Sequence, residues 1–470
     1  MYEESVTGNG THGGLAYTYM RQPMPSRRAF LSSALLIPGL SHRRVQAHRV
    51  SYEDILGTSM ELTVWTRHAG APATAAAAAL CEIRRLEALL STYRRDSEIS
   101  RFGRALRSAG SVERASLLDR YDDWRGWTGG VITSEIGGRL NVDALGKSFI
   151  VDRVVAHLHR TISELDGIVL NIGGDVAVSG RAATVNVIDP RRPAENDDPI
   201  ARLSITDRAV ATSGSYARAG HLIDPRTGQK ANGALAATVI ALDCTTANAL
   251  ATALCVLAPE DGLALVERTA GAESLVITAS GTERRSSGFA AYEQARPAPA
   301  TVAAGWPAGY DVRIALTLTG PGTSGSSDGR GRGRGRGSYR SPYVAVWADD
   351  TRGRPIRTIA VWGDKWRYLG ELPDWWSFAK NDSALNTTAT RATRPAGQYT
   401  IVWNGLDDKG APVPAGSYRL NLEVSREHGT YARRAGVIAC ASAPATVTLS
   451  ESVEFAPVTI AYGPRPAPTW

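Results

Sequence analysis

The sequence predicts an α+β domain followed by an all-β, sandwich-like domain, and three observations lead to this prediction. The chain has 470 residues, which is too long for one typical domain. Between residues 50 and 280, segments with strand-like alternation are interspersed with segments of helical periodicity. From residue 306 onward, eight of the eleven tryptophans occur, and short strand patterns recur between turn residues.

Residues 1–47 have the features of an export leader. The sequence SRRAFL at 26–31 is a twin-arginine pattern, and an apolar run over 29–40 and a small-residue site ending at Ala47 follow it. The run is too short to span a bilayer, and no other apolar run approaches that length. We therefore expect export by the twin-arginine route, a periplasmic or otherwise extracytoplasmic location, and no integral membrane segment. An ordinary amphipathic leader would also fit this pattern.

The first domain is expected over 48–282, and its elements follow from apolar spacing. Alternation predicts strands at 55–65, 184–190 and 237–243, and GIVLNIGGDVAVSG at 167–180 predicts a strand, a tight turn and a second strand. Apolar residues three and four apart predict helices at 73–92, 147–160 and 246–258.

Residues 283–305 are rich in Ala, Pro, Ser and Gly and are expected to be a linker. The second domain, 306–470, should contain strands at 396–405 and 415–424, joined by the turn LDDKGAPVP, and a disordered Gly-Arg loop at about 320–340. Its tryptophans predict either a buried core or an exposed aromatic platform, and the core is the more common arrangement. The residues in question are Trp347, Trp362, Trp366, Trp375 and Trp376.

Composition excludes some classes of protein. The net charge is +7, but only five residues are lysine, so the positive charge reflects arginine usage, and we expect no nucleic-acid partner. The four cysteines are widely spaced without a zinc-ligand pattern, which leaves one disulfide open.

Four short motifs contain residues suited to chemistry, and each could equally have a purely structural role. Lys147 could meet a phosphate near a helix start, or could be solvated there. The turn NIGGD (171–175) could approach a nucleotide closely, or could be an ordinary β-turn. Asn248 and Thr252 share a helix face, where they could bind Mg²⁺ or satisfy one another in a core. His221 could act as a general base, or could be a surface residue.

The order of the motifs is more specific than any one of them. In chain order they are ILGTSMEL, LLSTYRRDSEISRF, ALGKSFIVD, LNIGGD, ATSGSYARAGHLIDPRTG and TVIALDCTTANALATAL. Over about residues 52–280 they resemble the ApbE-type flavin transferases, which are FAD:protein FMN transferases. The C-terminal third resembles a periplasmic β-domain of unknown function, through SPYVAVWADD and RTIAVWGDKWRYLGELPDWW.

The resemblance implies an α+β flavin-transferase domain that takes FAD as its substrate in a cleft. His221 would remove the proton from a Ser or Thr hydroxyl in the flavinylation motif of an acceptor protein, and Asp224 would orient His221. The hydroxyl would attack FAD, FMN would become esterified to the acceptor, and AMP would leave. Mg²⁺ would be held by Asn248, Thr252 and a backbone carbonyl near Gly146. The resemblance assigns FAD binding to nine residues: Gly57, Thr58, Lys147, Gly173, Gly174, Asp175, Thr212, Ser213 and Gly214.

Three departures from the family pattern keep two further functions open. Asn248 stands where the family has Asp, Asn141 and Ser148 replace an Asp and a Gly, and the region 103–140 is shorter than in the family. The first of these functions is an FAD pyrophosphatase, in which water replaces the acceptor hydroxyl. The second is that of a catalytically degenerate exported protein that binds flavin or recognises a surface.

Overall fold

The computed structural model describes residues 44–103, 110–191, 199–214, 222–295, 305–320, 341–363, 366–380, 390–391, 394, 396–426 and 430–465. The twin-arginine pattern, the Arg-Gly stretch at 326–338 and His221 lie outside these residues. The predicted cleavage point at Ala47 lies in the first strand, which begins at Gln46.

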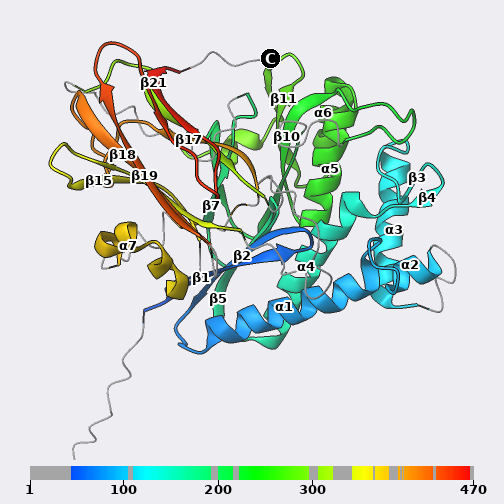
Figure 1. Ribbon diagram of the computed structural model, residues 1–470. Coiled ribbons are helices and arrows are strands. Elements are labelled where there is room, and N and C mark those ends of the chain that lie inside the picture. The colour runs from blue at the N-terminus through cyan, green and yellow to red at the C-terminus, as the bar shows by residue number, and fades with distance from the viewer. Residues whose placement is uncertain are drawn as a thin grey trace, which may run out of the picture. The chain divides into compact units, whose positions relative to one another are not determined.

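The first domain is built on an eight-stranded antiparallel sheet (Figure 1). Two of its strand pairs, β1 with β2 and β5 with β6, are hairpins whose turns lie at the ends of the strands. In spatial order the strands are β1 (Gln46–Ile55), β2 (Thr58–Thr66), β5 (Leu165–Ile172), β6 (Asp175–Ser179), β9 (Arg208–Gly214), β10 (Ala234–Ala241), β11 (Glu273–Thr278) and β12 (Glu283–Arg285).

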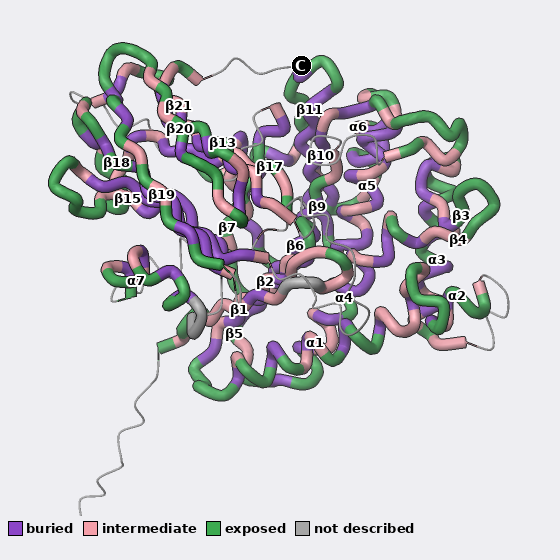
Figure 2. Tube along the Cα trace, in the orientation of Figure 1, coloured by how far each residue is buried: buried purple, intermediate pink, exposed green. Residues whose placement is uncertain are grey.

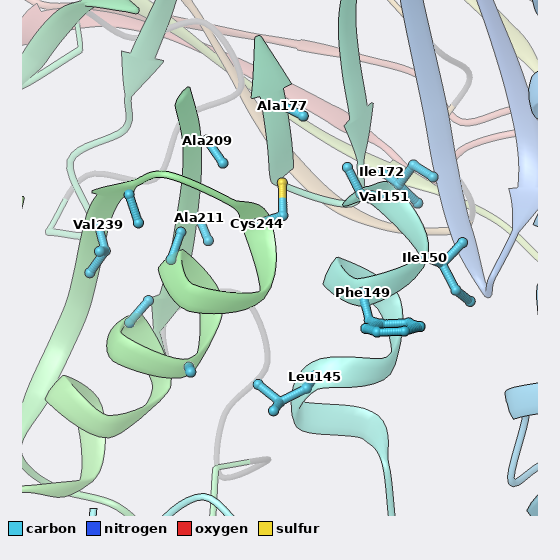
Figure 3. Close-up of a cluster of buried hydrophobic side chains, with 14 of the residues drawn as sticks. Leu145, Phe149, Ile150, Val151, Ile172, Ala177, Ala209, Ala211, Val239 and Cys244 are labelled. Atoms are coloured by element: carbon cyan, nitrogen blue, oxygen red, sulfur yellow. The ribbon is translucent and has the colours of Figure 1, made fainter. Parts of the chain in front are cut away.

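Helices cover one face of this sheet and form the main core with it. Figure 2 shows α5 as buried over most of its length, and Figure 3 shows apolar side chains of α4, α5 and the sheet in one cluster. A two-stranded ribbon and a short 3₁₀ helix cover part of the other face, where they enclose a second cluster. The helices are α1 (Ala71–Leu90), α2 (Glu98–Phe102), α3 (Val112–Trp127), α4 (Asp143–Thr161), α5 (Cys244–Val256) and α6 (Pro259–Glu267). The remaining elements are β3 (Glu135–Ile136), β4 (Arg139–Leu140), β7 (Ala183–Val187), β8 (Ala201–Ile205) and η2 (Phe289–Tyr292).

The second domain consists of two sheets whose facing side chains form one core. The first sheet has the order β17, β13, β21, β20, and the second has the order β16, β15, β14, β18, β19. A short helix and a 3₁₀ helix cover the outer face of the second sheet. The elements are β13 (Tyr310–Leu318), β14 (Tyr343–Asp349), β15 (Pro355–Trp362), η3 (Trp366–Glu371), α7 (Pro373–Ala379), β16 (Thr390–Arg391), β17 (Gly397–Trp403), β18 (Gly416–Ser425), β19 (Tyr431–Cys440), β20 (Ala445–Leu449) and β21 (Val458–Pro464).

This architecture confirms the predicted fold class, with corrections to individual elements. The strand expected at 55–65 is a hairpin: β1 ends at Ile55, residues 56–57 form the turn, and β2 begins at Thr58. The expected linker is wrong over its first part, because β12 pairs with β11 and Phe289 is fully buried. The region 103–140 contains the 16-residue helix α3, which apolar spacing did not reveal.

Burial decides the role of three tryptophans in the second domain. Trp347, Trp362 and Trp375 are each at most 2% exposed, so these three belong to the core and not to an exposed platform. The disulfide that the sequence left open is absent, since all four cysteines are free thiols. No helix in the described part of the chain is long and apolar enough to cross a membrane.

Candidate active site

Two tight hairpin turns of the first sheet lie beside each other. The turn between β1 and β2 has positive φ at Leu56 (52°) and Gly57 (74°), and the turn between β5 and β6 has positive φ at Gly173 (55°) and Gly174 (91°). Positive φ at both central residues is typical of type I′ turns, for which glycine is the least strained choice. Gly57 therefore lies in a turn and not within a strand, contrary to our expectation. The amide of Gly173 donates to the carbonyl of Ser59 at 3.1 Å, which joins the two hairpins.

Position 173 requires glycine because of its neighbours as well as its positive φ angle. A Cβ atom at this position would lie 2.6 Å from Cγ2 of Thr58 and 3.1 Å from Nζ of Lys147. The ammonium of Lys147 donates to the carbonyl oxygen of Gly173 at 2.7 Å. The structure thus brings together Thr58, Lys147 and Gly173, three of the residues assigned to FAD binding, around a bare backbone. We call this group the lysine cradle.

Asp175 supports the lysine cradle through an ion pair. Its Oδ2 atom lies 3.4 Å from Nζ of Lys147, and its side chain is only 3% exposed. Burial raises the pKa of Asp175 to about 6, although the charge of Lys147 acts in the opposite direction. Apart from this ion pair, the buried Oδ2 atom has no hydrogen-bond donor in the described part of the chain. Because of this burial, Asp175 acts here on Lys147, whereas a direct bond to a ribose would require the side chain to be uncovered.

Polar groups of α4 and α5 contact each other and continue to the sheet. We call this row of contacts the polar seam, and its residues are Ala144, Ser148, Asn248, Thr252 and Ser213. The side-chain nitrogen Nδ2 of Asn248 donates to the carbonyl oxygen of Ala144 and lies 3.4 Å from Oγ of Ser148. Ser148 itself donates to the carbonyl of Leu145 at 3.0 Å, so its oxygen can accept from Asn248. Both neighbours are acceptors, which orients the NH₂ group of the amide toward α4 and Oδ1 away from it.

The seam continues to the sheet through hydroxyl groups. Thr252, one turn after Asn248, lies 3.2 Å from the hydroxyl of Ser213 on β9. Thr212, the neighbour of Ser213, pairs with the hydroxyl of Thr238 on β10 at 2.8 Å. Gly214 ends β9 opposite Ala236. Ser213 and Thr252 thus lie side by side, whereas Thr212 is engaged with the next strand.

The carbonyl that faces Asn248 belongs to Ala144. The resemblance implied a backbone metal ligand near Gly146, which is buried in α4 and whose amide donates to the carbonyl of Val142. Ala144 and Asn248 are 104 positions apart, and only the packing of α5 on α4 brings them together. Ala144 is therefore the backbone carbonyl near Gly146 that contacts Asn248.

These oxygens would fit a divalent cation only together with an anionic ligand, and only if the side-chain amide of Asn248 turned Oδ1 toward the carbonyl of Ala144, which its NH₂ group faces here. Asn248, Thr252 and the carbonyl of Ala144 are neutral, and the described residues contain no group of three or more His, Cys, Asp or Glu side chains that could hold a metal. Mg²⁺ prefers oxygen ligands and is commonly shared with substrate phosphates. The residues therefore fit a cation that a pyrophosphate brings with it.

The residues that follow His221 form a tight turn. Asp224 accepts two hydrogen bonds from the guanidinium of Arg226, at 2.9 and 2.8 Å, and this pairing lowers the pKa of Asp224. The amide of Gly228 closes the turn by donating to the carbonyl of Asp224 at 2.8 Å. Asp224 would have to share its carboxylate between Arg226 and His221 to orient the histidine as predicted.

An open cavity of about 700 Å³ lies against this turn. Arg226 forms part of its wall and packs over Gly130, where a Cβ would lie 3.8 Å from Cγ of the arginine. The other lining residues are Asp122, Arg125, Gly126, Gly129, Thr133, Glu135 and Pro225. The cavity is thus polar and contains charges of both signs.

Tyr93 is a further candidate that the sequence did not single out. The residue is 82% exposed, but its hydroxyl donates to Asp143 at the start of α4 at 2.8 Å, so the side chain is held beside the helix that carries Lys147. An aromatic ring held in this way suits stacking against a flat ring system. The only indication in the sequence was the position of Tyr93 within LLSTYRRDSEISRF, one of the motifs of the resemblance.

Comparison with known proteins agrees with the predicted family. Residues 114–276 match the model of the ApbE family, and residues 335–455 match a family described as "Predicted periplasmic protein (DUF2271)". An FAD:protein FMN transferase of Treponema pallidum (strain Nichols) is 30% identical over 178 residues, which are 33% of this chain and 48% of the relative. The chain thus spans about half the length of that relative.

A second relative and one solved structure extend the comparison. An FAD:protein FMN transferase of Vibrio cholerae serotype O1 is 26% identical over 309 residues, 50% of this chain and 89% of the relative. The structure "Flavin Transferase ApbE from Vibrio cholerae" aligns with a TM-score of 0.45 and 21% identity, over 53% of this chain and 100% of the other. Residues 114–276 of the chain are thus similar to the ApbE family, and residues 335–455 are similar to the DUF2271 family.

Proposed function

We propose that this protein transfers FMN from FAD to a Ser or Thr hydroxyl of an acceptor protein and releases AMP. The observation that carries the proposal is the lysine cradle, where the ammonium of Lys147 and the bare backbone of Gly173 adjoin each other. A pyrophosphate needs such a cation and close access to backbone, and the ApbE-family relatives are named for this transfer. Thr58, Gly174 and Ser213 would complete the FAD site.

The proposed reaction is a displacement at the phosphorus atom on the FMN side of the pyrophosphate. The acceptor oxygen forms a new bond to this phosphorus as the bond to the AMP oxygen breaks, and AMP leaves with that bonding pair. His221 takes the proton of the acceptor hydroxyl, and Asp224 orients His221. Mg²⁺, when bound, neutralises charge on the pyrophosphate oxygens. Lys147 holds the phosphates, and Tyr93 offers its ring for stacking.

Mass spectrometry of a single reaction tests this proposal. The purified protein is mixed with FAD, Mg²⁺ and a protein carrying a Ser/Thr flavinylation motif. We expect the acceptor to gain the mass of FMN while AMP accumulates. Release of AMP and free FMN without a labelled acceptor would instead identify an FAD pyrophosphatase. Retention of FAD without turnover would identify a flavin-binding protein that has lost catalysis.

We also propose a periplasmic location reached through the twin-arginine leader. The DUF2271 family is described as a predicted periplasmic protein, which agrees with the pattern SRRAFL. Fractionation of cells expressing the full chain, with and without Lys in place of Arg27 and Arg28, tests the route. The unchanged chain should be recovered outside the cytoplasm, and the double variant should remain inside it.

A further inference from the structure

The half-buried carboxylate of Asp152 ties α5 to α4 at the end of the polar seam. Oδ1 of Asp152 accepts a hydrogen bond from the amide of Cys244 at 2.7 Å, and Oδ2 accepts from the amide of Thr245 at 3.0 Å and from its hydroxyl at 2.6 Å. The three donors are the first groups of α5, so the helix N-terminus and the carboxylate attract each other. No Lys or Arg forms an ion pair with Asp152 within the described part of the chain.

The neighbours of Asp152 along α4 are the residues that contact Asn248. Ala144, Ser148 and Asp152 are spaced four apart, so they follow one another along one face of α4. On α5, Thr245 is followed by Asn248 in the next turn and by Thr252 in the turn after that. Asp152 thus holds the first turn, Ala144 and Ser148 contact the second, and the third reaches Ser213 on the sheet.

A helix cap alone does not require Asp152. Asp243 already caps α5, because its carboxylate accepts from the amide of Thr246 at 2.7 Å. The second carboxylate is costly to place there: burial raises the pKa of Asp152 to about 6, and the charge of Asp243 adds to this rise. What Asp152 supplies and Asp243 does not is a link between α5 and α4, through residues that lie 92 positions apart in the sequence. The carboxylate of Asp243 instead lies 4.0 Å from the guanidinium of Arg120 on α3.

We propose that Asp152 is a positioning residue that sets the register of α5 on α4, and with it the spacing of the oxygens of Asn248, Thr252 and Ala144. This inference rests on the proposed function, since it concerns the cation and pyrophosphate end of that site. A shift of α5 along α4 would separate Asn248 from Ala144 before it disturbed the apolar core, because hydrogen bonds depend on distance and angle more steeply than apolar contacts do.

The test compares Asp152→Asn with Asp243→Asn. Both variants exchange a carboxylate at the N-terminus of α5 for an amide of the same shape, but only the first acts on the link to α4. The primary measurement is the dissociation constant of Mn²⁺ for the FAD-bound protein without acceptor. It is determined by electron paramagnetic resonance. Removal of a residue that orients metal ligands typically weakens metal binding about 10- to 100-fold.

We expect Asp152→Asn to raise the dissociation constant of Mn²⁺ about tenfold, and the Mg²⁺ concentration for half-maximal transfer by a similar factor, with kcat at saturating Mg²⁺ within about twofold. Asp243→Asn should leave both concentrations within about twofold of the unchanged protein. Thr245→Val, which removes only the hydroxyl bond to Asp152, should give a smaller change in the same direction, and it provides the measurement if Asp152→Asn does not fold.

Equal effects of the two carboxylate substitutions, or an Asp152→Asn protein with unchanged Mn²⁺ affinity, would overturn the positioning role. Failure of the unchanged protein to bind Mn²⁺ with FAD would refute the proposed function itself.

Discussion

The substitution Asn248→Asp exchanges a hydrogen bond for a cation-binding group. In the protein as it is, the NH₂ group of Asn248 donates to the carbonyl of Ala144 and lies near the hydroxyl of Ser148. A carboxylate at this position would place an oxygen against the carbonyl oxygen of Ala144. The protein would lose one part-buried hydrogen bond and hold two oxygens against each other, which costs about 1–3 kcal/mol.

Mg²⁺ should reverse this loss in the variant alone. A cation between the new carboxylate and the carbonyl of Ala144 replaces the lost hydrogen bond and supplies a charge that Asn248 lacks. Binding of a ligand to the folded state alone stabilises it by about 2.7 kcal/mol when the ligand concentration is about 100 times the dissociation constant. The unchanged protein has only neutral oxygens at this place, so its stability without FAD should not respond to Mg²⁺.

The assay is urea unfolding without FAD, in EDTA and in excess Mg²⁺. We expect Asn248→Asp to be about 1–3 kcal/mol less stable than the unchanged protein in EDTA and to recover most of this in Mg²⁺. Asn248→Ala is the control, because it loses the same hydrogen bond but gains no charge, and it should be destabilised equally in both solutions. If Mg²⁺ stabilised all three proteins to the same extent, Asn248 would not be at the cation site.

Three further predictions concern the catalytic base and the lysine cradle. His221→Ala should abolish transfer and leave FAD binding unchanged, as measured by flavin fluorescence and acceptor labelling; full transfer by this variant would exclude His221 as the base. Gly173→Ala should lower stability by more than the roughly 1–2 kcal/mol expected for positive φ alone and should weaken FAD binding, because its Cβ would lie 2.6 Å from Thr58. Gly174→Ala is the matched control with open space around its Cβ, and equal losses in urea unfolding and FAD titration would contradict this reasoning. Asp175→Asn should flatten the pH dependence of stability between about pH 4 and 6. The pKa of Asp175 in the folded protein is about 6 and lies above its unfolded value, so Asp175 contributes up to about 3 kcal/mol of stability at low pH, which is lost as the pH rises. A pH dependence identical to that of the unchanged protein would refute this.

Local patterns predicted several of the elements and the glycine turn of the lysine cradle. The apolar spacing of 246–258 agrees with α5 at Cys244–Val256, and the two glycines of NIGGD lie in the expected turn with positive φ. These features are visible in sequence because each depends on residues within a few positions of one another. Lys147 lies in the second turn of α4 and not at the helix start, since α4 begins at Asp143, whose amide bonds to the side chain of Asn141, earlier than apolar spacing alone indicated.

The polar seam could not be predicted in the same way. Asp152 stands next to Arg153 in an amphipathic helix, where a carboxylate is usually a solvated residue, and nothing nearby in the sequence shows that its partners are Cys244 and Thr245. The choice between Ala144 and Gly146 as the carbonyl facing Asn248 depends on the rotation of α4 against α5. That rotation is set by the packing of both helices on the sheet, and a single sequence does not encode it locally.

The positions of the two carboxylates would let them tune the proposed cation site, whose own oxygens are neutral. Asp175 is buried and contacts Lys147, which would face the pyrophosphate. Asp152 is half-buried and contacts the first turn of α5, which precedes Asn248. A carboxylate placed directly at the cation would bind Mg²⁺ in the absence of FAD. With Asn248 in that place, the negative charges of Asp175 and Asp152 affect the cation only indirectly, through Lys147 and α5. We therefore expect the cation to bind when FAD supplies its phosphates and to be released when AMP leaves.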